Sequence, residues 1–133
     1  MIPRYSREEI IKIWEPKNRY NLWLDIELHA AKAMELYKII PKGTSSKIRK
    51  KAKINVERIN QIEKKTKHDV IAFLTSIAEK VGSDAKYLHQ GMTSSDILDT
   101  CFNIQLKQSG KILLKDIDSI LISLRKKSIK YQN

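Results

Sequence analysis

The residues best suited to chemistry lie in three short segments. In the first, Arg4 and Tyr5 combine a guanidinium fork that suits phosphate with a hydroxyl donor, although residues near a terminus are often frayed. The second, Lys67-His68-Asp69, places a cation and an imidazole at a predicted helix start, where backbone donors are free. A structural interpretation stays open there, with Asp69 as a plain helix cap and His68 as a surface loop residue.

The third segment joins a glycine turn to the start of a very long predicted helix. It reads Tyr87-Leu88-His89-Gln90-Gly91-Met92-Thr93-Ser94-Ser95-Asp96. Free backbone donors and the positive end of the helix dipole make such a start receptive to a carboxylate or a phosphate. One hydroxyl must cap the helix, but three hydroxyls with His89 close by exceed what a cap requires. A structural role and an anion-binding role both remain open.

Capping residues and apolar periodicity predict two helices before Pro41. Ser6 and Glu9 have the spacing of a capping box, so a short helix should begin at Ser6 and stop before Pro16. A longer helix should begin near Asn18. Its buried stripe is expected to contain Leu22, Ile26, Ala30 and Ala33, widened by Trp23, Leu36 and Tyr37.

Three further helices are expected before the third segment. A short basic helix should be capped by Ser45 or Ser46, and another should cover residues 54–65. Asp69 should cap a helix that runs through Val81. The inward side chains of the last two helices are expected to be Ile59, Ile62 and Val56, and Val70, Phe73, Leu74 and Ile77.

A helix of unusual length is expected to begin at Thr93. Apolar residues recur there at intervals of three or four, which predicts about 37 helical residues, roughly 55 Å at 1.5 Å per residue. Such a rod cannot bury its whole stripe against the rest of a small domain, so its distal half must meet other chains or further sequence. The expected stripe contains Leu98, Phe102, Leu106, Ser109, Leu113, Ile117, Ile120 and Leu124.

Length and composition restrict the class of protein. A chain of 133 residues with few glycines and prolines suits one compact, mostly helical, all-α domain. It shows neither the apolar core of a signal peptide nor a membrane-spanning run, so a soluble, cytoplasmic protein without a membrane partner is expected. The single cysteine, Cys101, excludes an internal disulfide framework and a multi-cysteine metal site, and is expected to fill a helix face.

Positive charge is concentrated between Lys42 and Lys67. The net charge of the chain is +11, and this segment has ten basic residues against Glu57 and Glu63, a local charge of +8. An ordinary solvated face, a funnel for an anionic metabolite and a nucleic-acid surface would all look like this. The segment contains no aromatic residue, so base stacking lacks an obvious agent.

The three segments together resemble the adenylosuccinate lyases of the fumarase/aspartase superfamily. Gly91 to Ile97, followed by Asp99-Thr100, is similar to the first signature segment of that family. Residues 67–73 resemble its histidine-aspartate helix start, and Arg4-Tyr5-Ser6 followed by Ile13-Trp14 resembles its amino terminus. The segments occur in the family's order and cover nearly the whole chain. The carboxymuconate cycloisomerase branch, which shares a Thr-Ser-x-Asp segment, is the closest alternative.

The resemblance implies a fold and a reaction. Residues 1–92 would form an amino-terminal helical domain, and 93–133 would be the start of a truncated domain of long central helices that bundle in a homotetramer. Such enzymes eliminate fumarate from adenylosuccinate, giving AMP, and from succinylaminoimidazole carboxamide ribonucleotide in purine biosynthesis. They need no metal or organic cofactor. The substrate is a small nucleotide rather than a nucleic acid.

The resemblance also implies roles for individual residues. Arg4 and Tyr5 would contact the nucleotide phosphate, and Thr93 and Ser94 would bind a succinyl carboxylate. His89 is a secondary candidate for the phosphate region. The remaining substrate-binding candidates, which would lie near the reacting nitrogen and the ribose, are Lys67, His68 as a supporting residue and Asp69.

The resemblance places the general-acid histidine and the serine base in segments that these 133 residues do not contain. We therefore expect an isolated fragment or a truncated gene product that is inactive alone. An alternative is a basic helical module that binds nucleic acid or a partner helix. Salt-dependent nucleic-acid binding would favour this module, whereas protection of His68 and His89 by nucleotide would favour the lyase.

Overall fold

A computed structural model describes residues 2–132, and every regular element within them is helical. The predicted all-α class is therefore confirmed for this part of the chain. The outer limits of the two expected domains, Met1 and Asn133, lie outside the described residues. The elements are η1 (Pro3–Tyr5), α1 (Glu8–Trp14), α2 (Pro16–Leu36), α3 (Thr44–Lys51), α4 (Val56–Thr66), α5 (Asp69–Val81), η2 (Gly82–Tyr87) and α6 (Ser94–Lys130).

The core forms where α2 and α5 pack together with the first turns of α6. Tyr20, Trp23 and Phe73 are fully buried, and their rings meet edge to face at centroid distances of 5.2 Å (Tyr20–Trp23) and 5.5 Å (Trp23–Phe73). Aromatic pairs in this arrangement contribute about 0.5–1.5 kcal/mol beyond their burial. Ile77 of α5 and Ile97 of α6 are fully buried members of the same core cluster.

The buried stripe of α2 differs from the prediction. Its buried members are Tyr20, Trp23, Glu27, Leu28, Ala31 and Glu35. Of the predicted stripe, only Trp23 is buried; Leu22, Ile26 and Ala30 are partly buried, Ala33 is exposed, and Leu36 and Tyr37 are 74% and 80% exposed. Apolar residues lie around much of α2, so periodicity left its orientation open. The two large aromatic rings, together with two buried glutamates, determine which face turns inward.

The first two helices begin close to the predicted residues, each displaced by two positions, but the predicted cap of the first helix is wrong. The α1 helix begins at Glu8, and Arg7 is its N-cap with no side-chain bond, so the expected capping box of Ser6 and Glu9 does not form. The Ser6 hydroxyl instead donates to the carbonyl of Ile2 at 3.0 Å. The α2 helix begins at Pro16. Proline is accepted in the first turn of a helix because the backbone N–H that it lacks would have no partner within the helix there.

The middle helices are close to prediction. Gly43, with a left-handed φ of 86°, is the N-cap of α3, so neither Ser45 nor Ser46 caps it. At the start of α4, the Asn55 side chain accepts the backbone N–H of Arg58 at 2.9 Å. Ile59 and Ile62 are buried there as expected. Within α5, the predicted Val70, Phe73 and Ile77 are buried and Leu74 is partly buried.

The α6 helix has the predicted start and length, 37 residues with Thr93 as N-cap, but its inner face is displaced by one position. Its buried residues are Ile97, Cys101 and Gln105, whereas Phe102 and Leu106 of the predicted stripe are about half exposed. The α1 helix explains the choice of face. It lies along α6, where the Gln105 amide donates to the carbonyl of Ile13 at 2.7 Å.

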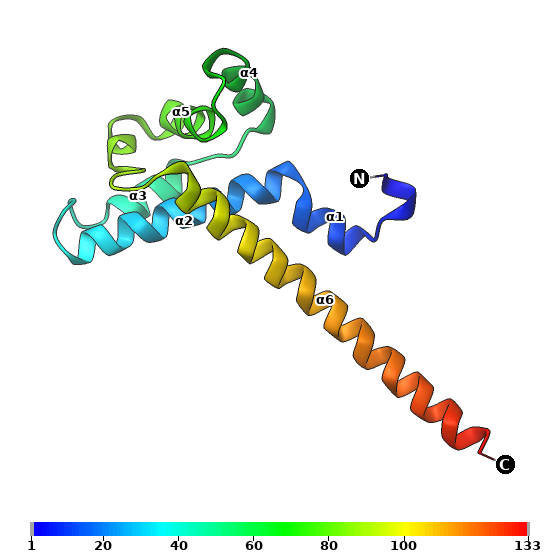
Figure 1. Cartoon of the computed structure of the whole chain (residues 1–133). Coiled ribbons are helices and arrows are strands. Elements are labelled where there is room, and N and C mark those ends of the chain that lie inside the picture. The colour runs from blue at the N-terminus through cyan, green and yellow to red at the C-terminus, as the bar shows by residue number, and fades with distance from the viewer. Residues whose placement is uncertain (1, 133) are drawn as a thin grey trace.

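Beyond these contacts α6 leaves the rest of the molecule. Figure 1 shows it extending diagonally away from the other helices to the carboxyl end. Every residue from Ile117 to Gln132 is exposed. The expectation that α6 is too long to bury its whole apolar stripe against the rest of the chain is therefore confirmed for the described residues.

Candidate functional site

The start of α6 presents hydroxyls and backbone donors on a defined turn. The carboxylate of Asp96 accepts the backbone N–H of Thr93 at 2.7 Å, the return bond of a capping box. Thr93 is thus the expected cap. Ser94 is partly buried, and its hydroxyl has no hydrogen-bonding partner within residues 2–132. This hydroxyl lies at the positive end of a 37-residue helix, where a carboxylate is stabilised.

The turn before α6 is held by a carboxylate from α2. His89 has a left-handed φ of 58°, which is uncommon for a residue with a side chain. Glu27, 1% exposed, accepts the backbone N–H of His89 at 2.7 Å, and its other oxygen lies 2.8 Å from Nδ1 of the same residue. His89 is therefore fixed by two bonds to a buried residue. Sequence reasoning missed Glu27.

The signal that could have identified Glu27 is its position in α2. It lies four residues after Trp23 and four before Ala31, so it shares their face. A glutamate on a buried face needs partners, because an unpaired charge removed from water is costly. The predicted stripe was centred on Leu22, Ile26 and Ala30, and it did not include Glu27.

The segment at residues 67–69 forms the tight connection between α4 and α5. Lys67 is exposed and left-handed, with φ 54°, and caps the carboxyl end of α4. His68, rather than Asp69, is the N-cap of α5, and its Nδ1 accepts the backbone N–H of Ile71 at 3.4 Å. Asp69 is the first helical residue and accepts the N–H of Val70. The expectation that Asp69 is a plain cap is therefore wrong.

The cap leaves the His68 side chain accessible. It is 46% exposed and lies 3.6 Å from the Asp69 carboxylate, measured from Nδ1 to Oδ1. Since Nδ1 accepts a backbone N–H, the proton of the neutral ring belongs on Nε2, which faces away from the helix. The ring can therefore donate a hydrogen bond to a ligand from a fixed position.

The amino-terminal pair is the most exposed part of the candidate set. The Arg4 guanidinium lies over the Tyr5 ring, 4.6 Å from its centroid, and Tyr5 is 73% exposed. Figure 1 shows η1 beyond α1, well separated from the start of α6. No hydrogen bond joins the three candidate segments to one another within residues 2–132. The structure thus fixes each segment but does not bring all of them into one site within a single chain.

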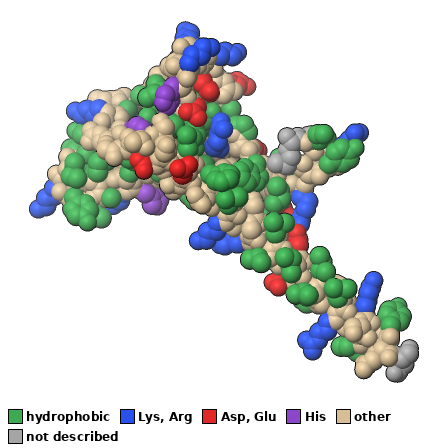
Figure 2. Space-filling model, viewed as in Figure 1, with side chains coloured by type: hydrophobic (Ala, Val, Ile, Leu, Met, Phe, Trp, Pro, Cys, Tyr) green, Lys and Arg blue, Asp and Glu red, His purple; other side chains and the backbone are tan. Residues whose placement is uncertain are grey.

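The basic side chains between Lys42 and Lys67 include two arginines in ion pairs. Arg49 is paired with Asp25 at 2.8 Å, and Arg58 forms a two-pronged contact with Glu79. This pairing lowers the pKa of Glu79. Figure 2 shows lysines and arginines in several separate groups on the face in view. The partners of both arginines lie outside the segment between Lys42 and Lys67, so these two pairs offset part of its local charge of +8.

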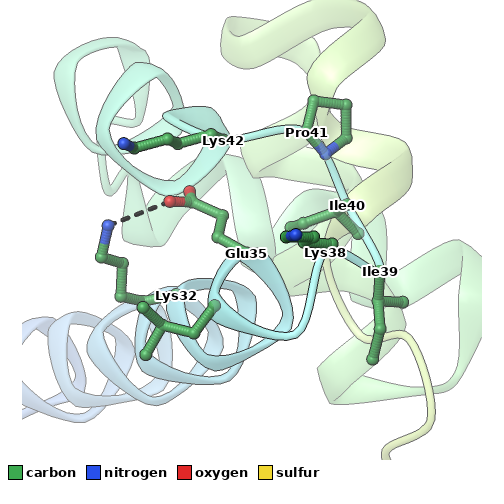
Figure 3. Close-up of a pocket in the computed structure, with 8 residues that line it drawn as sticks. Lys32, Glu35, Lys38, Ile39, Ile40, Pro41 and Lys42 are labelled. Atoms are coloured by element: carbon green, nitrogen blue, oxygen red, sulfur yellow. Dashed lines mark hydrogen bonds and ion pairs between the residues drawn. The ribbon is translucent and has the colours of Figure 1, made fainter.

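A pocket of about 700 Å³ lies away from the candidate residues, at the turn between α2 and α3. Figure 3 shows Glu35 there, joined to Lys32, with Lys38 and Lys42 nearby. The Glu35 carboxylate accepts the backbone N–H of Ser45 at 2.6 Å, which lowers its pKa from 4.5 to about 2. Because this carboxylate already binds the first turn of α3, we interpret it as a structural link between helices.

Residues 2–132 contain no cluster of three or more His, Cys, Asp or Glu side chains that could hold a metal ion. Within the same residues, no helix has both the length and the apolar character to cross a membrane. Cys101 is buried beside α2, as expected of a residue that fills a helix face, and burial raises the pKa of its thiol.

Comparisons with known proteins extend over nearly all of the chain. A family model described as "Lyase" matches residues 4–133. The adenylosuccinate lyase of Staphylococcus saprophyticus subsp. saprophyticus is 40% identical over 132 residues, which are 99% of this chain and 31% of that protein. The crystal structure of a fumarate lyase from Mesorhizobium sp. BNC1 superposes with a TM-score of 0.77 at 20% identity, over 87% of this chain and 29% of that one. The chain thus spans about a third of the length of these relatives.

Proposed function

The chain belongs to the lyase family whose model spans residues 4–133, and from this we propose that it forms the amino-terminal, substrate-binding part of an adenylosuccinate lyase. The proposed reaction is β-elimination of fumarate from adenylosuccinate and from succinylaminoimidazole carboxamide ribonucleotide. The observation that carries the proposal is the 40% identity to an adenylosuccinate lyase over 132 residues, a range that includes all three candidate segments.

The reaction defines what the protein must supply. A base removes a proton from the carbon beside a carboxylate, and the negative charge of the carbanion spreads into that carboxylate. An acid then protonates the departing nitrogen. Donors around the carboxylate stabilise the intermediate more than the ground state, because the intermediate carries more negative charge. A further anchor must hold the phosphate.

The start of α6 suits the carboxylate. Thr93 and Ser94 combine side-chain hydroxyls with the free backbone donors of a long helix, and Asp96 already satisfies the N–H of Thr93. In our proposal Ser94 donates its otherwise unpartnered hydroxyl to a succinyl carboxylate. His89, held beside this turn by Glu27, would contact the phosphate region.

The other two segments would complete the contacts to the nucleotide. His68 can donate from Nε2 toward the reacting nitrogen, with Lys67 and Asp69 beside it. Arg4 and Tyr5 would bind the phosphate. Since η1 is well separated from the start of α6 in one chain, we propose that segments from several subunits of a homotetramer meet in each site. The exposed half of α6 would supply the contacts between those subunits.

Titration of the 133-residue chain with adenylosuccinate, followed by NMR, tests the proposal. We expect shifts of the His68 and His89 ring signals and of the Ser94 amide, while His29 on α2 serves as an internal control. Ser94→Ala should weaken binding by about tenfold, the effect of one hydrogen bond to a charged group. Ser95→Ala, its exposed neighbour, is the matched control.

The basic-module alternative predicts a different result. In that case the amides of α3 and α4 would respond to duplex or single-stranded DNA, with affinity falling steeply as salt rises. Such a response, together with unchanged histidine signals in adenylosuccinate, would contradict the proposed function.

A further inference from the structure

Two hydrogen bonds join Glu27 and His89. Within residues 2–132, no other polar side-chain contact to a candidate residue spans so many positions in the sequence. The two bonds join positions 62 residues apart, and within residues 2–132 the Glu27 side chain has no other hydrogen-bonding partner. Its side chain is fully enclosed, whereas that of His89 is 18% exposed. A carboxylate in such a place costs several kcal/mol unless hydrogen bonds compensate it. Glu27 therefore depends on His89 as much as His89 depends on Glu27.

The contact also selects which ring nitrogen of His89 can meet a ligand. Oε2 of Glu27 accepts the backbone N–H, and Oε1 lies 2.8 Å from Nδ1. A carboxylate oxygen accepts hydrogen bonds, so Nδ1 must carry the proton in the neutral ring. Nε2 has no hydrogen-bonding partner within residues 2–132, and part of the side chain is exposed. A carboxylate that orients a histidine through its inner nitrogen is a common device in catalytic and metal sites.

We propose that Glu27 is a positioning residue, which holds a proton on Nδ1 of His89, so that the ring meets the substrate phosphate as an imidazolium that donates from Nε2. The part that concerns substrate rests on the proposed function. The fixed ring rests on the geometry alone. The same two bonds hold the left-handed backbone of His89 and so set the turn that leads to Gly91 and Thr93.

The tautomer of each ring can be measured directly from the 15N shifts of the imidazoles, in the 133-residue chain at a pH where the rings are neutral. We expect the proton of His89 on Nδ1. His68 is an internal reference with its proton expected on Nε2, because its Nδ1 accepts the N–H of Ile71. A His89 ring with its proton on Nε2, or a freely averaging ring, would overturn the proposal without any variant.

Glu27→Gln gives the sharper comparison. A glutamine can accept the backbone N–H and donate its amide to Nδ1, which moves the ring proton to Nε2 with little change in shape. Glu35→Gln is the matched control, since Glu35 is a second buried carboxylate of α2 that contacts α3 and not His89. We expect the tautomer to invert in the first variant only. An unchanged His89 tautomer in folded Glu27→Gln, checked by circular dichroism, contradicts the proposal.

Measurement of adenylosuccinate binding tests the role of Glu27 toward substrate separately from its fixing of the His89 ring. We expect Glu27→Gln to bind about tenfold more weakly than the wild-type chain, because a ring whose Nδ1 accepts from glutamine meets the phosphate without a positive charge. Glu35→Gln should bind equally well. Equal affinity in all three, with an inverted tautomer in Glu27→Gln, would remove the positioning role toward substrate. Absence of any binding by the wild-type chain would count against the proposed function, and the tautomer measurement would still decide whether Glu27 fixes the ring.

Discussion

At the scale of single residues, caps show what sequence spacing can and cannot predict. Thr93 is the cap that the sequence indicated, but the caps of α1 and α5 are Arg7 and His68, each next to the predicted residue. A cap depends on which residue leaves the helical backbone conformation, and spacing constrains this only to within a residue. Glu27 is a different case. Its burial depends on His89, a partner 62 residues away, and no local pattern reveals that partner.

The capping-box bond between Thr93 and Asp96 leads to a prediction about the stability of the α6 start. Asp96→Ala removes the acceptor of the Thr93 N–H, so we expect a loss of about 1 kcal/mol in the free energy of unfolding. Urea denaturation measures it. Asp99→Ala, an exposed carboxylate one turn later, is the control and should change stability by less than about 0.5 kcal/mol. Equal effects of the two substitutions would argue against a capping role.

At the scale of elements, the existence and length of the helices were predictable, but the faces of two were not. The α6 face is displaced by one residue, because Ile97, Cys101 and Gln105 together meet α1 and α2. Periodicity identifies a helix from apolar spacing, yet α2 and α6 carry apolar residues on more than one side. The partner helices choose between those sides, and their positions are a property of the whole fold.

Glu35 supplies a pH-dependent link between two elements. Its pKa is lowered from 4.5 to about 2 by the backbone N–H of Ser45, so it stabilises the fold above pH 4.5, and this contribution is lost as the pH falls toward 2. Glu35→Gln cannot titrate. We therefore expect the wild-type chain to exceed this variant in stability at pH 7, and the difference to shrink between pH 4.5 and 2. Urea midpoints measured across this range test the prediction, and a constant difference would contradict it.

At the scale of the whole molecule, our proposal assigns substrate-binding residues to the chain, and the family resemblance places the general acid and the base in segments that residues 1–133 do not contain. We predict that the 133-residue chain alone releases no measurable fumarate from adenylosuccinate, because positioning supplies only part of the rate enhancement. A fumarate-release assay decides the point, with a full-length lyase as the positive control. Turnover near that of the control would mean that the chemistry belongs to residues within 1–133.

The exposed half of α6 gives the last prediction, self-association of the chain. Leu113, Ile117, Ile120 and Leu124 are 51–58% exposed, and each gains roughly 1.5–3 kcal/mol when fully buried. Contiguous apolar surfaces of this kind usually acquire a partner, and the same stripe on a second copy is self-complementary.

Substitution of the stripe tests this prediction. Ile117→Lys combined with Leu124→Lys should shift the chain toward monomer in sedimentation experiments, while the helices before α6 stay folded. The matched control is Leu36→Lys with Ile39→Lys, two exposed apolar residues at the α2–α3 turn, which should leave association unchanged. A wild-type chain that remains monomeric at high concentration, with its helicity intact, would show that the stripe does not drive assembly by itself.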